Sequence, residues 1–370
     1  MVSLWEKQSF LSYDRIIIGA GITGLSTAAS LKEEHPNLSV AVLERGILPS
    51  GASTKNAGFA CFGSVSELLA DNRTLGEKRM ISLVRKRVEG LALMRKRLGD
   101  VKIDFKQKGG YELIFENEDP ALVALEEVNA LLKEIFQEPV FSLADHKIAE
   151  FGLAKTKHLI FNQFEGQIDT GKMMSALWDH CSALGVKILT GCEVLSINEV
   201  ESAIDLVCRE VNFQAKRVAI CCNAFSNQFF PELFDLKPGR GLVLSVVPQK
   251  PLGLAGTFHY DEGYYYFRDY NGKLLFGGGR NFDQQTEQTV EFGVNEEIMR
   301  KLLTDLEEII LPDQAYEVEQ IWSGIMAFGE YKSPILKKIS DRVAVGIRLG
   351  GMGVAIGSLV GAELAMMLSD

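Results

Sequence analysis

Several kinds of segment are missing from this chain of 370 residues. No apolar run reaches the roughly 18 residues that are needed to cross a bilayer. The first ten residues, M-V-S-L-W-E-K-Q-S-F, lack the long apolar stretch of a signal peptide and include an acid. No internal repeat and no low-complexity tract is evident. We therefore expect a globular protein with no transmembrane segment.

Cysteine, histidine and basic residues are also too few or too scattered for certain functions. The six cysteines form no C-x-x-C pair and no zinc spacing with the five histidines, and so we expect no metal site. Reduced thiols are typical of a cytoplasmic protein. The formal net charge is −10, which argues against a nucleic-acid partner because binding to phosphates needs a basic surface.

What the chain does contain is a dinucleotide-binding pattern near its N-terminus. An apolar run ending at Ile18 is followed by Gly19, Gly21 and Gly24, and a second apolar run ends at Glu44. Strand, glycine turn, helix, strand and acid in this order are typical of a nucleotide-binding βαβ unit. The helix N-terminus would bind the pyrophosphate, and the carboxylate would accept the ribose hydroxyls and repel the 2′-phosphate of NADP. The pattern predicts FAD or NAD.

A stretch of small residues follows this unit. Residues 50–64 read S-G-A-S-T-K-N-A-G-F-A-C-F-G-S. A flexible linker would be more polar and would lack Phe59 and Phe62, so we interpret the stretch as a place where the backbone closely approaches a flat ligand.

The remaining pattern indicates two kinds of structure. Nucleotide-type strands and helices return near residues 160–226 and after residue 340, and mainly helical and antiparallel segments lie between. We predict an α/β fold with a Rossmann-like domain built from three segments, and a substrate domain with a mostly antiparallel sheet and helices. The predicted ranges are 1–90, 150–228 and 320–370 for the nucleotide-binding domain, and 91–149 and 229–319 for the substrate domain.

Taken together, these motifs resemble the FAD-dependent amine and amino-acid oxidases of the D-amino-acid oxidase superfamily, which includes glycine oxidase, sarcosine oxidase and γ-glutamylputrescine oxidase. S-G-A-S-T-K-N-A-G-F is similar to the G-A-S-x-R-N-x-G segment of that family. The stretches at 218–226, 321–324 and 350–361 resemble its later flavin-contacting motifs. The resemblance covers nearly the whole chain and implies FAD. Because no cysteine stands near the W-x-G or the C-terminal motif, we expect FAD to be bound non-covalently.

The resemblance also implies which residues contact FAD. These are Gly19, Ala20, Gly21, Ile22, Thr23, Gly24, Glu44, Arg45, Gly51, Ala52, Ser53, Thr54, Lys55, Asn56, Ala57, Gly58, Phe59, Val194, Cys222, Asn223, Ala224, Gly350, Gly351, Met352, Gly353 and Val354.

Residues 263–268 resemble the family strand that carries an active-site tyrosine. Alternation places Tyr264, Tyr266 and Arg268 on one face of this strand, and Tyr264 best matches the substrate tyrosine; an aromatic core or sheet edge remains the alternative. Lys55, from the small-residue stretch, is a candidate for the cation that assists the reduction of O2. His259 is expected to be a surface histidine, and a position in a pocket wall is the alternative.

One position departs from the family pattern. Amino-acid oxidases of this group place an arginine two residues after the glycine of W-x-G, where it binds the substrate carboxylate; this chain has Met326 there. Either the substrate lacks an α-carboxylate, or another arginine binds it, with Arg348 the first choice and Arg240 and Arg280 next. The N-A dipeptide at 223–224 looks closer to the amine-oxidising branch, which favours the first option.

The resemblance therefore implies an FAD-dependent oxidoreductase that oxidises the C–N bond of a small amine or amino acid by hydride transfer to the flavin. Hydrolysis of the imine and reoxidation by O2 or another acceptor would follow. Three alternatives remain: an FAD-linked dehydrogenase with a quinone or protein acceptor, an NAD-dependent dehydrogenase, and a flavin-binding module without turnover. The sequence leaves the oligomeric state open.

Overall fold

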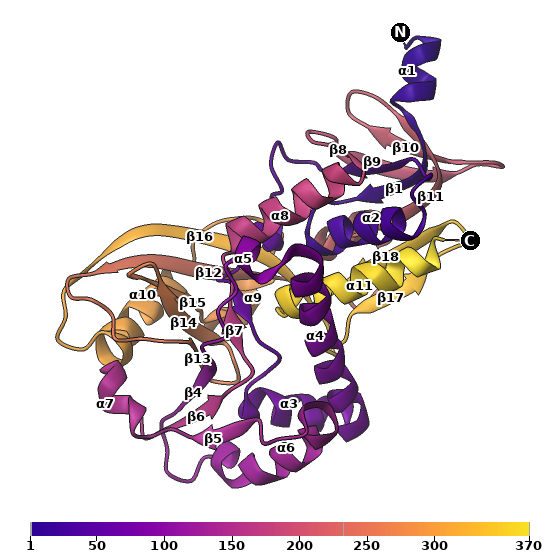
Figure 1. Cartoon of the computed structure of the whole chain (residues 1–370). Helices are drawn as coiled ribbons and strands as arrows, with labels where there is room; N and C mark the ends of the chain where they lie inside the picture. Colours follow the sequence, from indigo (N-terminus) through magenta and orange to yellow (C-terminus); the bar gives the residue numbers. More distant parts are fainter. Residues whose placement is uncertain (1, 232, 370) are drawn as a thin grey trace.

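Two large β-sheets organise the chain, as the computed structural model in Figure 1 shows for residues 2–231 and 233–369. The first sheet has the strand order β17-β18-β11-β1-β2-β8, and β10 and β9 extend it from β11 as an antiparallel pair. Its strands are β1 (Ser12–Ile18), β2 (Val40–Leu43), β8 (Lys187–Leu189), β9 (Val194–Glu199), β10 (Ile204–Cys208), β11 (Phe213–Ile220), β17 (Ile335–Lys338) and β18 (Val343–Ile347). The five neighbouring strands β18, β11, β1, β2 and β8 run parallel to one another.

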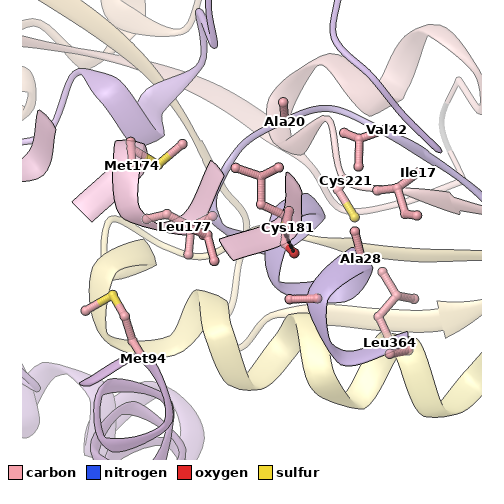
Figure 2. Packing of buried hydrophobic residues seen from close by; sticks show 14 of the residues in the cluster. Ile17, Ala20, Ala28, Val42, Met94, Met174, Leu177, Cys181, Cys221 and Leu364 are labelled. Atoms are coloured by element: carbon pink, nitrogen blue, oxygen red, sulfur yellow. Dashed lines mark hydrogen bonds between the residues drawn. The ribbon is translucent and has the colours of Figure 1, made fainter. Parts of the chain in front are cut away.

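Helices from distant parts of the sequence cover one face of this parallel sheet. They are α2 (Ile22–Glu34), α8 (Thr170–Ala183) and α11 (Gly353–Met367), and α4 (Glu77–Leu98) packs against α11 and α8. Figure 2 shows the resulting core, in which Ile17, Met94, Leu177 and Leu364 belong to one buried cluster. Strand β1 is apolar from Ile16 to Ile18 because both of its faces are buried, which is typical of a parallel strand.

The second sheet has the order β16-β12-β15-β14-β13-β4-β6-β5 and is antiparallel except between β13 and β4. Its strands are β4 (Gly110–Ile114), β5 (Phe141–Leu143), β6 (His158–Asn162), β12 (Lys237–Pro248), β13 (Thr257–Tyr260), β14 (Tyr265–Tyr270), β15 (Lys273–Gly278) and β16 (Tyr316–Phe328). Helices α3 (Val65–Leu75) and α6 (Pro120–Phe136) pack near one end of this sheet, and α10 (Glu296–Asp305) packs near the other.

Short elements complete the fold. They are α1 (Leu4–Ser9), α5 (Asp100–Ile103), α7 (Lys147–Phe151), α9 (Gln284–Glu287), a strand pair of β3 (Phe59–Ala60) and β7 (Gly166–Gln167), the 3₁₀ turns η1 (Ala52–Thr54), η2 (Asn223–Gln228) and η3 (Arg280–Asp283), and the π turn η4 (Leu306–Ile310). Among the helices described, none combines the length and apolar character that crossing a membrane requires.

The α/β fold and the mostly antiparallel second sheet are confirmed, but some elements differ from the sequence expectation. Strands β6 and β16 lie in ranges that the sequence assigned to the nucleotide-binding domain, yet both pair in the second sheet. Helices α3 and α4 are separate although they follow one another directly, because Gly76 has a φ of +78° and ends α3. Strand periodicity shows that a segment is extended but does not show which sheet it joins, and so the domain ranges stay a prediction.

Candidate active site

A cavity of about 470 Å³ lies where the two sheets meet. Residues at or just beyond the carboxyl ends of three parallel strands line it: Gly19 after β1, Glu44 after β2 and Cys222 after β11. Val243 and Tyr266 of the antiparallel sheet also line it. In open α/β sheets this edge is the usual place for a ligand.

The glycine turn between β1 and α2 is close-packed. Gly19 has a φ of +103°, a left-handed conformation that side chains disfavour. A Cβ on Gly24 would lie 1.9 Å from the carbonyl oxygen of Gly19, so α2 approaches the end of β1 as closely as its backbone allows. Helix α2 therefore begins at the cavity, where Gly21 provides no side-chain cap for its N-terminus.

Glu44 lies at the same end of the cavity and is buried. One of its carboxylate oxygens accepts a hydrogen bond from the N–H of Ala20 (3.0 Å), and the other accepts from the N–H of Gly46 (3.1 Å) and the hydroxyl of Ser50 (3.2 Å). The carboxylate is thus held in one orientation beside the glycine turn, where the sequence predicted an acceptor for ribose hydroxyls.

Residues 50–59 form the next wall, and hydrogen bonds fix their backbone between α2 and β16. The hydroxyl of Ser53 accepts a bond from the N–H of Ile22 (3.0 Å). The Asn56 side chain accepts from the hydroxyl of Thr170 (2.8 Å). Trp322 donates its indole N–H to the carbonyl of Lys55 (2.9 Å), which connects this loop to the W-x-G segment.

The C-terminal glycine loop closes the opposite wall. Gly350 and Gly351 have φ values of +58° and +82°, and α11 begins at Gly353 without a side-chain cap. The N-terminus of α11 therefore faces the cavity with its partial positive charge. The N-termini of α2 and α11 thus border one continuous space, and neither is capped by the side chain of its own N-cap residue, although Ser53 binds the N–H of Ile22 in α2.

The fold brings a cysteine to this wall, although none stands near the C-terminal motif in the sequence. The Cys61 sulfur lies 3.7 Å from the sulfur of Met352. The two residues are 291 positions apart in the chain, so their contact is visible only in the fold. Burial raises the pKa of the Cys61 thiol well above its ordinary value, and the charges of Glu165 and Glu67 add to this effect.

Most residues predicted to contact FAD line the cavity. They are Gly19, Gly21, Ile22, Thr23, Glu44, Arg45, Gly51, Ala52, Ser53, Lys55, Asn56, Ala57, Phe59, Val194, Cys222, Asn223, Gly350, Gly351, Met352, Gly353 and Val354. Five of the predicted residues do not belong to the cavity lining in the described part of the chain. They are Ala20, Gly24, Thr54, Gly58 and Ala224. Gly24 lies at the close contact between α2 and β1, and Ala224 packs in the core. Side-chain atoms at these two positions therefore face other parts of the protein and not the cavity.

Both tyrosines singled out from the sequence line the cavity. Tyr266 lies over Gly277 and packs edge-on against Phe59, with 5.5 Å between the ring centres. Burial raises the pKa of Tyr266 to about 12, although the charge of Arg280 opposes this shift, so the side chain stays a neutral phenol. Tyr264 lies in the turn just before β14.

Arg348, the first choice for a carboxylate-binding arginine, points elsewhere. Its guanidinium donates to the carbonyl of Ser333 (3.0 Å) and to the carbonyl (2.7 Å) and carboxylate (3.0 Å) of Asp235. Arg240 is likewise occupied, because it pairs with Glu287 at 2.7 Å. Neither arginine belongs to the cavity lining in the described part of the chain. The expectation for Arg348 is therefore wrong, since Asp235 holds its side chain in a structural ion pair.

Arg280, by contrast, does line the cavity, where Tyr264 and Phe328 also line it. Its guanidinium carbon lies 3.7 Å from the ring centre of Phe328 and 5.1 Å from that of Tyr264. No carboxylate among the described residues forms an ion pair with it. Burial lowers the pKa of this guanidinium below its ordinary value, which reflects the cost of a desolvated charge. An anion in the cavity would reduce that cost.

Met326 also lines the cavity, where it packs against Gly241. The side chain at the expected arginine position is therefore a neutral part of the cavity, and the cation comes from η3. The sequence named Arg280 only as a third choice, because distance along the chain does not show which arginine lacks a carboxylate partner.

His259 was expected on the surface, and this expectation is wrong. It is buried in the cavity wall, where Nε2 lies 3.2 Å from the Glu165 carboxylate. Burial alone would lower the pKa of His259, but the hydrogen bond and charge of Glu165, with the charges of Glu67 and Glu112, raise it above the ordinary value. Burial raises the pKa of Glu112 to about 7, although hydrogen bonds from Ser66 and Ser64 oppose the shift.

These shifts predict how stability depends on pH. A histidine whose pKa is raised on folding contributes stability that is complete below its unfolded pKa of about 6.5 and is lost as the pH rises through its folded pKa. Replacing Glu165 with glutamine removes the charge that raises the pKa of His259. We expect thermal unfolding from pH 6 to 9 to show a flatter decline in Tm for Glu165→Gln than for the original protein.

Glu112 also has a raised pKa, so its contribution to stability falls over a lower window, as the pH rises from about 4.5 to 7. This decrease in stability, which comes from Glu112, is expected to remain in the Glu165→Gln variant. Equal slopes for the two proteins above pH 7 would contradict the role given to Glu165.

The sequence did not indicate that one face of α3 lines the cavity. Glu67, Ala70 and Thr74 line the cavity at helical spacing. A glutamate three positions after Ser64 is a normal capping residue, and therefore nothing in the local pattern indicated a ligand-facing role. Phe328 was missed because it lies beyond the W-x-G motif, at the end of a long strand.

Comparison with known proteins agrees with this geometry. Residues 14–367 match the family model described as FAD dependent oxidoreductase (DAO). The chain belongs to this family. No curated protein matches it closely enough to count as a relative by sequence.

Solved structures of family members share the fold. Glycine oxidase from Geobacillus kaustophilus superposes with a TM-score of 0.78 at 22% identity, covering 97% of this chain and 95% of that one. L-proline dehydrogenase from P. horikoshii gives 0.77 at 17% identity, with 96% and 92% covered. L-amino acid deaminase from Proteus vulgaris gives 0.73 at 18% identity, with 96% and 90% covered.

The cavity fits the FAD that membership of the DAO family implies. Glu44 and the end of α2 suit an adenosine diphosphate group, because a fixed carboxylate and free helix N–H groups recognise ribose and phosphate. The loop at 50–59 and the start of α11 border the remaining space towards Tyr266 and Arg280, where a flavin ring would lie. The DAO-family chain is thus an FAD-dependent oxidoreductase of the amino-acid oxidase type.

Proposed function

We propose that this chain oxidises the C–N bond of a small α-amino acid, with Arg280 binding the substrate carboxylate. When bound, FAD would supply the acceptor for a hydride from the α-carbon and would be reoxidised by O2 or another acceptor, and water would hydrolyse the imine product to a carbonyl compound and an amine or ammonia. This proposal replaces the amine-only reading that Met326 suggested from the sequence.

The observation that carries the proposal is a buried cation without an ion-pair partner. The guanidinium of Arg280 contacts the rings of Tyr264 and Phe328, while Arg240 and Arg348 have carboxylates of their own. An arginine can donate two parallel hydrogen bonds to a carboxylate, which fixes the orientation of the substrate as well as its position. The names of the structural neighbours, which refer to glycine, proline and other amino acids, agree with this class of substrate.

Two further side chains have proposed roles in the same cavity. Tyr266 remains a phenol at neutral pH and would donate a hydrogen bond to the substrate, and Tyr264 would form the wall beside the carboxylate. Lys55 runs along Gly324, and none of the described carboxylates pairs with it. Its positive charge would stabilise the negative charge that develops when O2 is reduced.

We further propose that FAD is held without a covalent bond and that the protein lies in the cytoplasm. The thiol next to Met352, Cys61, is buried and its pKa is raised well above the ordinary value, so the thiolate that would attack a flavin is disfavoured. All six cysteines are free, which is the normal state in a reducing compartment. Acid precipitation tests the first point: FAD should stay in the supernatant.

The function itself is tested by the visible spectrum of the purified protein and by anaerobic addition of amino acids and amines. We expect flavin absorption bands, bleached by an α-amino acid and not by the amine that lacks its carboxylate. Bleaching by amines alone would return the assignment to an amine oxidase. Rapid return of colour in air would identify O2 as an acceptor, whereas slow return would favour a dehydrogenase with a quinone or protein acceptor.

A further inference from the structure

We infer that Glu67 makes the cavity selective for a substrate with a second positive charge, an amino acid whose side chain ends in an ammonium or guanidinium group. The inference rests on the proposed function, because the same cavity binds the α-carboxylate through Arg280. It adds the chemical class of the side chain.

Glu67 is a buried carboxylate, and one of its two oxygens accepts no hydrogen bond from the described residues. The residue lies on the first turn of α3 and is only 6% exposed. One carboxylate oxygen accepts a hydrogen bond from the N–H of Ser64 (3.1 Å), which caps the helix. The other oxygen has no hydrogen-bond donor among the described residues, and the side chain lines the cavity. Capping therefore accounts for one oxygen and leaves the second available to a ligand.

Neighbouring cavity charges already have partners. Glu262 pairs with Arg73 at 2.8 Å, and Lys332 pairs with Asp71 at 2.9 Å. Lys55 and Arg280 are cations and belong to the acceptor and carboxylate ends of the proposed reaction. Glu67 is thus the one carboxylate at the substrate end, within the described chain, that lacks a cationic partner.

The surroundings of Glu67 increase the excess of negative charge. Glu165 and Glu112 are buried nearby, and the charges of all three carboxylates act on the buried His259. The single positive charge of a protonated His259 is shared with Glu165 at 3.2 Å. A cationic group entering the cavity would compensate a carboxylate that the protein otherwise keeps in a desolvated site, and this favours a cation over a neutral side chain.

The position of Glu67 relative to Arg280 suits a substrate with charges at both ends. A Cβ on Gly263 would lie 2.5 Å from the carboxyl carbon of Glu67, so this carboxylate packs directly on the turn that precedes Tyr264. Arg280 lies 5.1 Å from the ring centre of the same tyrosine. The Glu67 carboxylate and the Arg280 guanidinium therefore both lie beside the segment of Gly263 and Tyr264, in the lining of one cavity.

A role for Glu67 at the reacting amine fits less well. Loss of a hydride from the α-carbon needs the lone pair of a neutral amine, and an adjacent carboxylate would favour the protonated ammonium form. A cation at the far end of the side chain has no such conflict. The carboxylate consequently acts on specificity and not on the chemical step.

The experiment compares lysine, ornithine and arginine with norleucine, an uncharged analogue similar in shape to lysine. For the original protein we expect kcat/KM to be roughly 10- to 100-fold higher for the best basic amino acid, as a charge-assisted hydrogen bond predicts. In Glu67→Gln we expect this ratio to fall to about 1, with the value for norleucine unchanged. Glutamine still accepts the hydrogen bond from Ser64, so α3 keeps its cap.

Glu262→Gln is the matched control, because it removes a rim carboxylate that already pairs with Arg73; the ratio should change by less than about 3-fold. A preference for norleucine, or an unchanged preference in Glu67→Gln, would overturn the inference. If no amino acid reduces the flavin, the proposed function fails separately. In that case, calorimetry compares the binding of arginine and norleucine to the holoprotein. Tighter binding of arginine that is lost in Glu67→Gln would support the role of Glu67, and equal binding of the two would overturn it.

Discussion

Replacing Arg280 with methionine is expected to lower kcat/KM for the amino-acid substrate by about 100- to 1,000-fold, while the flavin content stays the same. The size of this decrease in kcat/KM follows from the loss of one partner of a buried charge pair, which costs about 2–5 kcal/mol. Most of the effect should appear in KM, because the carboxylate is bound equally before and during the reaction. Anaerobic flavin reduction at varied substrate concentration gives both parameters.

Arg240→Met is the control for Arg280, since Arg240 is bound to Glu287 outside the cavity lining. We expect this variant to lose stability, because the Glu287 carboxylate is left buried without its partner. Its KM should be close to that of the original protein. If Arg280→Met retained normal kcat/KM and Arg240→Met did not, the assignment of the carboxylate site would be wrong.

The second large effect is expected for Gly24→Ala. The added Cβ would lie 1.9 Å from the carbonyl oxygen of Gly19, a contact with the backbone that no side-chain rotation can relieve. Helix α2 must then move away from β1, at a cost of about 3 kcal/mol, which corresponds to a fall in Tm of roughly 5 °C or more. The same movement withdraws the N-terminus of α2 from the cavity, so the purified variant should contain little FAD.

Gly51→Ala provides the matched comparison. A Cβ at this position meets no atom within 4 Å, and its φ of −79° is normal for alanine. We expect a change in stability within about 0.5 kcal/mol, as for most substitutions outside the core. Because Gly51 itself lines the cavity, the comparison is made on the apoproteins. Equal Tm values for the apo forms of Gly24→Ala and Gly51→Ala would show that α2 does not depend on the close contact at Gly19.

The two halves of the site differed in how far they could be predicted. The nucleotide end follows from local sequence: Gly19, Gly21 and Gly24 are spaced for one turn, and Glu44 follows the next strand at the distance that a βαβ unit imposes. The substrate end has no such local rule. There the prediction of Arg348 was wrong, because Asp235, which is 113 residues away, binds its guanidinium.

The sequence by itself determined the α/β fold, the FAD-dependent family and the glycine turn and acid that we assign to the nucleotide. These depend on short-range periodicity and on glycine spacing, which physical chemistry restricts to few backbone shapes. Only the tertiary structure decided that Arg280 and Glu67 face the cavity, that His259 is buried beside Glu165, and that Cys61 lies against Met352. The physical reason is that burial and charge pairing depend on contacts between segments far apart in the chain, and such contacts leave no local pattern.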